Sequence, residues 1–179
     1  VLTCLAPTGA TKGGSAIYLA ASLILFGISA LYHRFYWSPR WEIVWNRLDH
    51  SNIFLLIAGT YTPLSIAILP HDQAVTILSI VWGGALLGIL LNLFWPTAPR
   101  WLATLIYVAL GWVALWYLPQ FWALGGAVIV WLLLAGGILY TIGAVVYATK
   151  KPDLSPRWFG FHEIFHLCTV LAWACHCVA

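Results

Sequence analysis

Two histidines near the end of the chain have the spacing of paired metal ligands. His162 and His166 are four residues apart, so on a helix their imidazoles project from one face about one turn apart. Both can then reach one metal ion. A third imidazole from another helix would complete the three-ligand set of catalytic zinc sites, in which water takes the fourth position. These residue types therefore predict metal-assisted hydrolysis.

The same segment, HEIFH, matches the H-E-x-x-H signature of zinc metallopeptidases, in which the glutamate is the general base. Such enzymes usually take their third ligand from further along the chain, yet no acidic residue follows Glu163. The third ligand is then expected upstream. This favours His33 and weakens the peptidase hypothesis.

Ionisable residues inside the apolar stretches of this chain need a physical reason, because each costs on the order of 2.5–3.5 kcal/mol in a bilayer. His33 ends the first stretch, Asp49 begins the second, and His162 and His166 begin the last. Those three points fall on one side of the membrane when the stretches are threaded back and forth. We therefore predict a metal site formed by His33, His162 and His166, with Asp49 beside it.

Other interpretations are open for several of these polar residues. Asp49 could only cap its helix, since acidic residues favour helix N-termini. Ser29 lies one turn deeper than His33 and could bond to a backbone carbonyl of its own helix. His50 and His71 are expected to be interfacial or hydrogen-bonded residues. His176, about 15 Å along the helix from His166, is expected to make a separate buried polar contact.

The elements that must position these residues are membrane helices. The chain is 63% hydrophobic and 7% charged, whereas soluble domains carry about a quarter charged residues. The apolar stretches are about 20 residues long and show no period-two alternation, so helices are preferred to a barrel. The six stretches are approximately Ser15–Tyr36, Leu48–Leu69, Ala74–Trp95, Trp101–Leu118, Ala123–Thr149 and Phe159–Ala179. They predict an all-α, polytopic transmembrane bundle forming one domain over residues 1–179.

The positive charges predict the orientation of the bundle. One side receives every Lys and Arg except Lys12, and the positive-inside rule assigns that side to the cytoplasm. The metal site would then lie near the cytoplasmic face of the plasma membrane, with the C-terminus outside. Because the basic residues are split among short loops, they give no reason to expect a nucleic-acid partner.

Three strings carry a resemblance to a known family. The segments SALYH (Ser29–His33), RLDHSNIFLLIAGTYTP (Arg47–Pro63) and HEIFHLCTVLAWACH (His162–His176) resemble those of the bacterial hemolysin III proteins. These are relatives of the progestin and adipoQ receptors, which include the adiponectin receptors. The family fold has seven spans, so its first helix is expected to be missing from this chain.

The resemblance also implies roles for individual residues. It implies that His33, His162 and His166 bind zinc, that Asp49 contacts the water on the metal, and that Ser29 lies beside the site. The wider superfamily is similar to alkaline ceramidases, which implies hydrolysis of a membrane lipid amide or ester.

Two other functions stay open at this point. One is a receptor or sensor in which zinc is structural and a lipid is only a ligand. The other is a cytolysin, as the family name suggests. A water-filled pore needs polar linings, however, and the middles of the spans offer little beyond Ser22, Thr60, Asn92 and Thr141.

Overall fold

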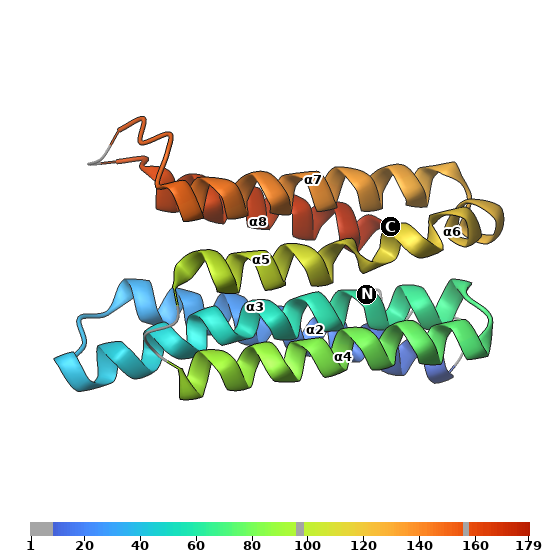
Figure 1. Cartoon of the computed structure of the whole chain (residues 1–179), viewed down its shortest axis with the longest axis horizontal. Coiled ribbons are helices and arrows are strands. Elements are labelled where there is room, and N and C mark those ends of the chain that lie inside the picture. The colour runs from blue at the N-terminus through green and yellow to red at the C-terminus, as the bar shows by residue number, and fades with distance from the viewer. Residues whose placement is uncertain (1–8, 96–98, 156–157) are drawn as a thin grey trace. The chain divides into compact units, whose positions relative to one another are not determined.

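The computed structural model describes residues 9–95, 99–155 and 158–179, which are predominantly helical (Figure 1). Within these ranges, six helical segments are long and apolar enough to cross a bilayer. The predicted all-α, polytopic fold is thus confirmed. The chain divides into two compact units, Val1–Ala98 and Pro99–Ala179.

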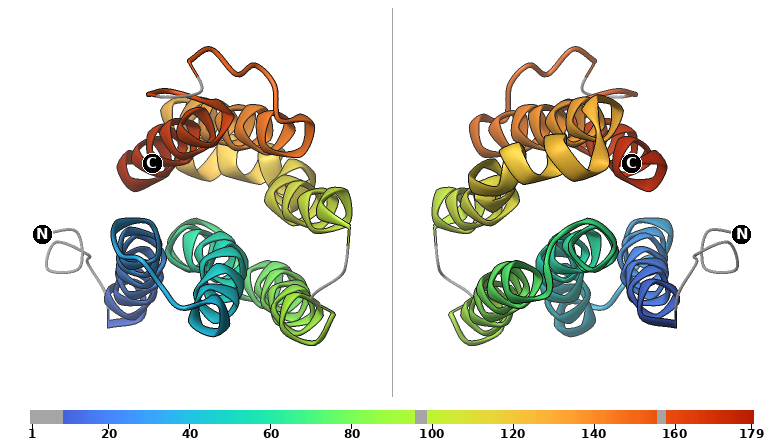
Figure 2. Two further views of the ribbon diagram at one scale, coloured as in Figure 1. Left: turned by 90° about the vertical axis from the view of Figure 1, so that its left-hand side faces the viewer. Right: turned by 90° about the vertical axis from the view of Figure 1, so that its right-hand side faces the viewer.

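The first unit contains three helices, α2 (Gly9–Arg34), α3 (Pro39–Ile68) and α4 (His71–Phe94). α3 lies between the other two and packs against both (Figure 2). Its Phe54 is fully buried, and the ring lies where a side chain on Gly88 of α4 would stand. Glycine at that position therefore allows α3 and α4 to approach closely, as small residues do between membrane helices.

The ends of α3 follow from its prolines. Pro39 occupies the first turn, where a missing N–H costs nothing because the first amides have no partner within the helix. Pro70 follows the C-cap residue Leu69 and stops the helix. Pro63 lies inside α3, just beyond Thr62, whose hydroxyl donates to the carbonyl oxygen of Ala58 at 2.8 Å.

The second unit is built around α7 (Ala127–Thr149), which packs against α8 (Phe161–Val178) and against the preceding helical segments. Those segments are α5 (Arg100–Gly111), a 3-10 stretch η1 (Trp112–Tyr117) and α6 (Leu118–Gly125). Together the three form one candidate span, Trp101–Gly125.

Several predicted span boundaries are wrong. The second helix begins at Pro39, not near Leu48, and the fourth span continues to Gly125 instead of ending at Leu118. Pro119 does not end the fourth span because it lies in the first turn of α6, where its missing N–H is tolerated. Gly126, at a φ of 85°, ends α6 instead, and the fifth span begins at Ala127 instead of Ala123.

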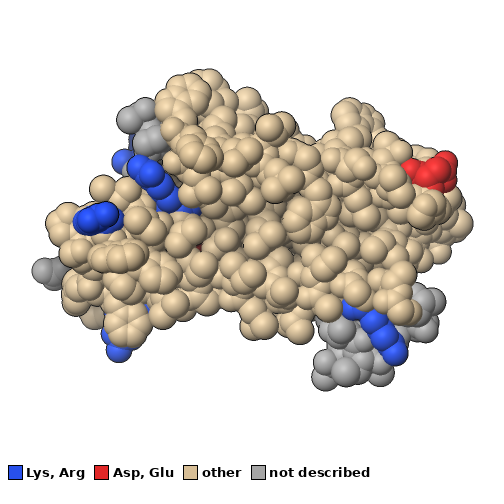
Figure 3. Space-filling view, turned by 90° about the horizontal axis from the view of Figure 1, so that it is seen from below, with Lys and Arg blue, Asp and Glu red and all other residues tan. Residues whose placement is uncertain are grey.

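The charged residues lie where a membrane protein would keep them. On the face drawn in Figure 3, the Lys, Arg, Asp and Glu side chains lie toward the ends, and the broad middle is covered largely by uncharged side chains. Many large apolar side chains are exposed along the helices, such as Leu87, Phe94 and Val128. Exposure of this kind suits contact with lipid tails.

Candidate metal and acid–base site

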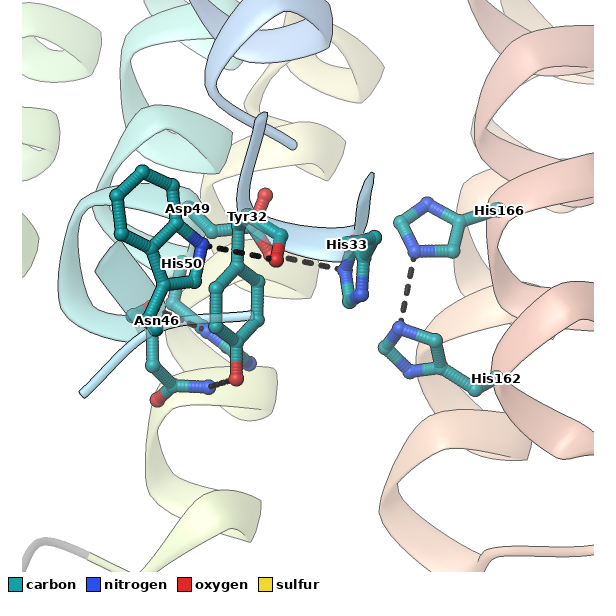
Figure 4. Close-up of polar contacts among 8 residues, drawn as sticks. Tyr32, His33, Asn46, Asp49, His50, His162 and His166 are labelled. Carbon is teal, nitrogen blue, oxygen red and sulfur yellow. Dashed lines mark hydrogen bonds and ion pairs between the residues drawn. The ribbon is translucent and has the colours of Figure 1, made fainter. Parts of the chain in front are cut away.

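The first unit brings Ser29 and His33 of α2 to Asp49 of α3. His33 Nε2 lies 3.7 Å from Asp49 Oδ2, and both Ser29 and His33 interact with the Asp49 carboxylate through their side chains. Asp49 is buried, with 10% of its side chain exposed, whereas the His33 side chain is 38% exposed. The carboxylate therefore interacts with two polar side chains of α2, and Figure 4 shows its pairing with His33.

The alternative that Asp49 only caps a helix is wrong. α3 begins at Pro39, so Asp49 lies well inside the helix, beyond the first turn. Its own backbone amide has a partner within α3, and its side chain is left for contacts with α2. A buried carboxylate at such a position in a membrane helix needs a partner of its own, and functional sites commonly supply one.

An asparagine of α4, Asn92, holds the part of α3 that carries Asp49. The amide nitrogen of Asn92, on α4, donates to the carbonyl oxygen of Arg47 at 3.0 Å and to the hydroxyl of Ser51 at 2.9 Å. In return, Arg47 Nη1 donates to the carbonyl oxygen of Leu93 at 3.4 Å. These bonds attach α3 to α4 on either side of Asp49. In the sequence, Asn92 stands out only as a polar residue in an apolar span, and that polarity was the signal available.

The connection between α2 and α3 is also tied to this region. The side-chain amide of Asn46 donates to the Tyr32 hydroxyl at 3.1 Å (Figure 4). The Trp37 indole N–H donates to the Tyr32 carbonyl oxygen at 3.3 Å. Tyr32 directly precedes His33. The contacts therefore restrain the last turn of α2, from which the His33 imidazole projects.

The second unit brings His162 and His166 together on one face of α8. Their Nε2 atoms are 3.0 Å apart, and the two rings meet nearly at right angles, at 84° (Figure 4). Aromatic rings of Tyr147 and Phe165 lie beside His162. The pair thus places two imidazole nitrogens close enough to share one ligand within an apolar span.

The geometry of this pair fits a metal ion. Zinc–nitrogen bonds of about 2.0–2.1 Å at a tetrahedral angle place two ligand nitrogens about 3.3 Å apart. The observed 3.0 Å needs only a small opening of the two side chains to reach that separation. Nitrogen ligands suit zinc and several other divalent transition metals.

Glu163 has a structural role at the start of α8. Its Oε2 accepts a hydrogen bond from the backbone N–H of Gly160 at 2.9 Å. A carboxylate in this position satisfies an amide that has no partner within the helix and favours the positive end of the helix dipole. The glutamate of the HEIFH segment is thereby explained without a catalytic role.

The remaining histidines make local contacts. His50 Nδ1 lies 2.7 Å from the carbonyl oxygen of Asn46, one turn earlier in α3, so His50 is a hydrogen-bonded residue, as expected, but inside the helix. His176 Nε2 lies 3.3 Å from the carbonyl oxygen of Leu133, and its ring lies where a side chain on Gly136 would stand. The expected separate polar contact of His176 is thus made with α7. His71 is the first residue of α4.

The predicted site residues thus form two groups. Ser29, His33 and Asp49 belong to the first unit, and His162 and His166 belong to the second. Within the first unit, Ser29 and His33 lie beside the Asp49 carboxylate. Within the second unit, the Nε2 atoms of His162 and His166 lie 3.0 Å apart. Whether one metal ion joins the two groups stays a prediction.

Comparison with known proteins gives a consistent result over almost the whole chain. The sequence model of the family described as "Haemolysin-III related" matches residues 2–177. Hemolysin-3 of Bacillus cereus is 35% identical over 166 residues, which cover 88% of this chain and 72% of that protein. The Hemolysin-3 homolog of Bacillus subtilis (strain 168) is 37% identical over 147 residues, covering 81% and 68% respectively. No solved structure gives a significant match.

Proposed function

This chain belongs to the haemolysin-III related family, and on that premise we propose that it is a zinc-dependent hydrolase of a membrane lipid amide or ester. The observation that carries the proposal is the pair of imidazoles on α8, whose Nε2 atoms are 3.0 Å apart inside an apolar span. Two histidines in such a place need a shared partner to offset the cost of leaving water.

We assign His33 as the third ligand on topological grounds. α2 ends at Arg34 and α8 begins at Phe161, with four membrane crossings between them. An even number of crossings returns the chain to the side on which α2 ended, so His33 and His162 belong to the same side of the bilayer. The excess of Lys and Arg on this side supports the cytoplasmic face of a plasma membrane, with the C-terminus outside.

In this hydrolysis, zinc, Asp49 and Ser29 would each have a separate role. When bound, zinc supplies a Lewis acid that acidifies water and polarises a carbonyl. Asp49, held by Ser29 and His33, accepts the proton of the attacking water as general base. The Ser29 hydroxyl donates a hydrogen bond to the oxygen on which negative charge develops. Exposed apolar faces of the helices give a lipid acyl chain access from the bilayer.

The first test measures the metal. Protein purified in detergent should contain about one zinc per chain, and a His162→Ala/His166→Ala double variant should contain almost none. His50→Gln is a matched control, because His50 contacts a backbone carbonyl on its own helix and should leave the metal content unchanged. Equal zinc in the double variant and the parent would refute the ligand assignment.

The second test measures turnover. Asp49→Asn should retain zinc and lose lipid hydrolysis by about 10²-fold or more, as expected for removal of a general base. Fatty acid release by this variant at the parental rate would show that Asp49 is not the base. A protein that binds zinc, is destabilised by its removal and releases no fatty acid from any lipid amide or ester would instead be a receptor or sensor.

A further inference from the structure

α3 carries a buried amide next to the proposed acid–base residue. Asn52 is 8% exposed, and in the part of the chain that the structure describes its Nδ2 atom is fully enclosed without a hydrogen-bond partner. A buried N–H group without a partner destabilises a folded protein, and more so in hydrocarbon, where water cannot replace the missing bond. Burial of the Asn52 amide therefore lowers the stability of the protein, and packing alone gives no reason for an asparagine at this position.

Asn92 gives the contrast within the same unit. Its amide nitrogen makes two hydrogen bonds, to Arg47 and Ser51, which attach α4 to α3. Asn92 thus holds two helices together. Asn52 has the same donor groups, but its nitrogen has no hydrogen-bond partner among the described residues.

The place of Asn52 in α3 associates it with Asp49. The two residues are three positions apart, so they share a helix face, and Asn52 lies about 4.5 Å further along the axis. Gly59, two turns beyond Asn52, lies against α2, since a Cβ on Gly59 would be 2.8 Å from the Cβ of Ala21. Asp49 also meets α2, through Ser29 and His33. Asn52 therefore follows Asp49 along the face of α3 that packs on α2.

We propose that Asn52 binds the acyl carbonyl of a lipid through its side-chain N–H groups, about one helical turn deeper in the bilayer than Asp49. The inference rests on the proposed function and extends it by naming a residue that positions the substrate. An unpaired N–H donor requires an acceptor, and the acceptor of a lipid acyl group is its carbonyl oxygen. The carbonyl can belong to an intact lipid amide or to a free fatty acid.

The test combines stability and binding for two matched substitutions in the full chain. For Asn52→Leu, the unfolding temperature without added lipid should equal or exceed that of the parent, because an unpaired polar group is removed. For Asn92→Leu the unfolding temperature should fall, because two hydrogen bonds are lost. Tryptophan fluorescence during heating measures the unfolding temperature of both variants. Asn52→Ala and Asn92→Ala repeat the comparison with a side chain smaller than leucine.

Binding is measured with palmitamide and with palmitic acid, each carrying ¹³C at the carbonyl. Asn52→Leu should bind the favoured probe about tenfold more weakly, as expected for one lost hydrogen bond. The infrared carbonyl stretch of the bound probe should move to higher frequency than in the parent. Preference for palmitamide indicates an intact amide, and preference for palmitic acid indicates a free fatty acid.

Three results would overturn the inference. They are a loss of stability in both Asn52 variants equal to that in the Asn92 variants, unchanged binding with an unchanged carbonyl stretch, or failure of the parent to bind either probe. Binding and infrared measurements need no turnover. A parent that binds palmitamide through Asn52 and never hydrolyses it would refute the hydrolase proposal alone.

Discussion

Replacement of Glu163 separates the two roles that its position allows. In the structure, Glu163 caps α8 through its hydrogen bond to the Gly160 N–H, whereas the metallopeptidase signature would make it the general base. Glu163→Gln keeps an oxygen acceptor and removes the charge, and Glu163→Ala removes both. We expect both variants to fold, bind zinc and hydrolyse lipid nearly as the parent does.

The size of the stability effect follows from the contacts. Loss of the charge at the helix N-terminus costs about 0.3–1 kcal/mol, and loss of the cap as well brings the cost to about 1–2 kcal/mol. For a chain of this length, each kcal/mol lowers the unfolding temperature by about 2–4 °C. Glu163→Gln should therefore lower it by about 1–4 °C and Glu163→Ala by about 2–8 °C.

The assay is thermal unfolding in detergent, followed by tryptophan fluorescence, together with fatty acid release from lipid. Glu42→Gln is a control, because Glu42 lies in the first turn of α3 and reports the effect of an N-terminal charge alone. A Glu163→Gln variant with parental zinc and stability but about 10²-fold less turnover would refute the capping argument. Glu163 would then replace Asp49 as the base.

Three further predictions concern packing, metal and topology. Gly136→Ala should lower stability by about 1–3 kcal/mol, because the added methyl overlaps the His176 ring, and should leave zinc content unchanged; unaltered unfolding would contradict the α7–α8 contact. Chelation of the metal should lower the unfolding temperature of the parent, as loss of any ligand specific to the folded state does, but not that of His162→Ala/His166→Ala. A reporter fused after Ala179 should be active only outside the cytoplasm, and cytoplasmic activity would reverse the assigned orientation.

Much of the fold could be predicted because the bilayer constrains it strongly. Helices about 20 residues long with few charges are the simplest way to satisfy backbone amides in lipid, so hydropathy locates them. The predicted span boundaries were wrong where the ends of an apolar stretch do not coincide with the ends of the helix. The first turns of α3 contain Arg40, Glu42 and Arg47, which reduce hydropathy without preventing a helix, and the helix continues into the interfacial region. In the fourth span, a 3-10 stretch precedes Pro119, and the helix resumes there.

The amino-acid sequence by itself determined the number of membrane helices and the helix faces on which His162, His166 and Asp49 lie. These depend on local hydropathy and on the 3.6-residue period. Only the tertiary structure decided which polar groups have partners: Glu163 bonds to Gly160, Asn92 bonds across to α3, and the Asn52 nitrogen is buried without a bond to any residue that the structure describes. The physical reason is that a side chain's hydrogen bonds depend on which neighbour faces it across a helix contact, and that choice is made by packing.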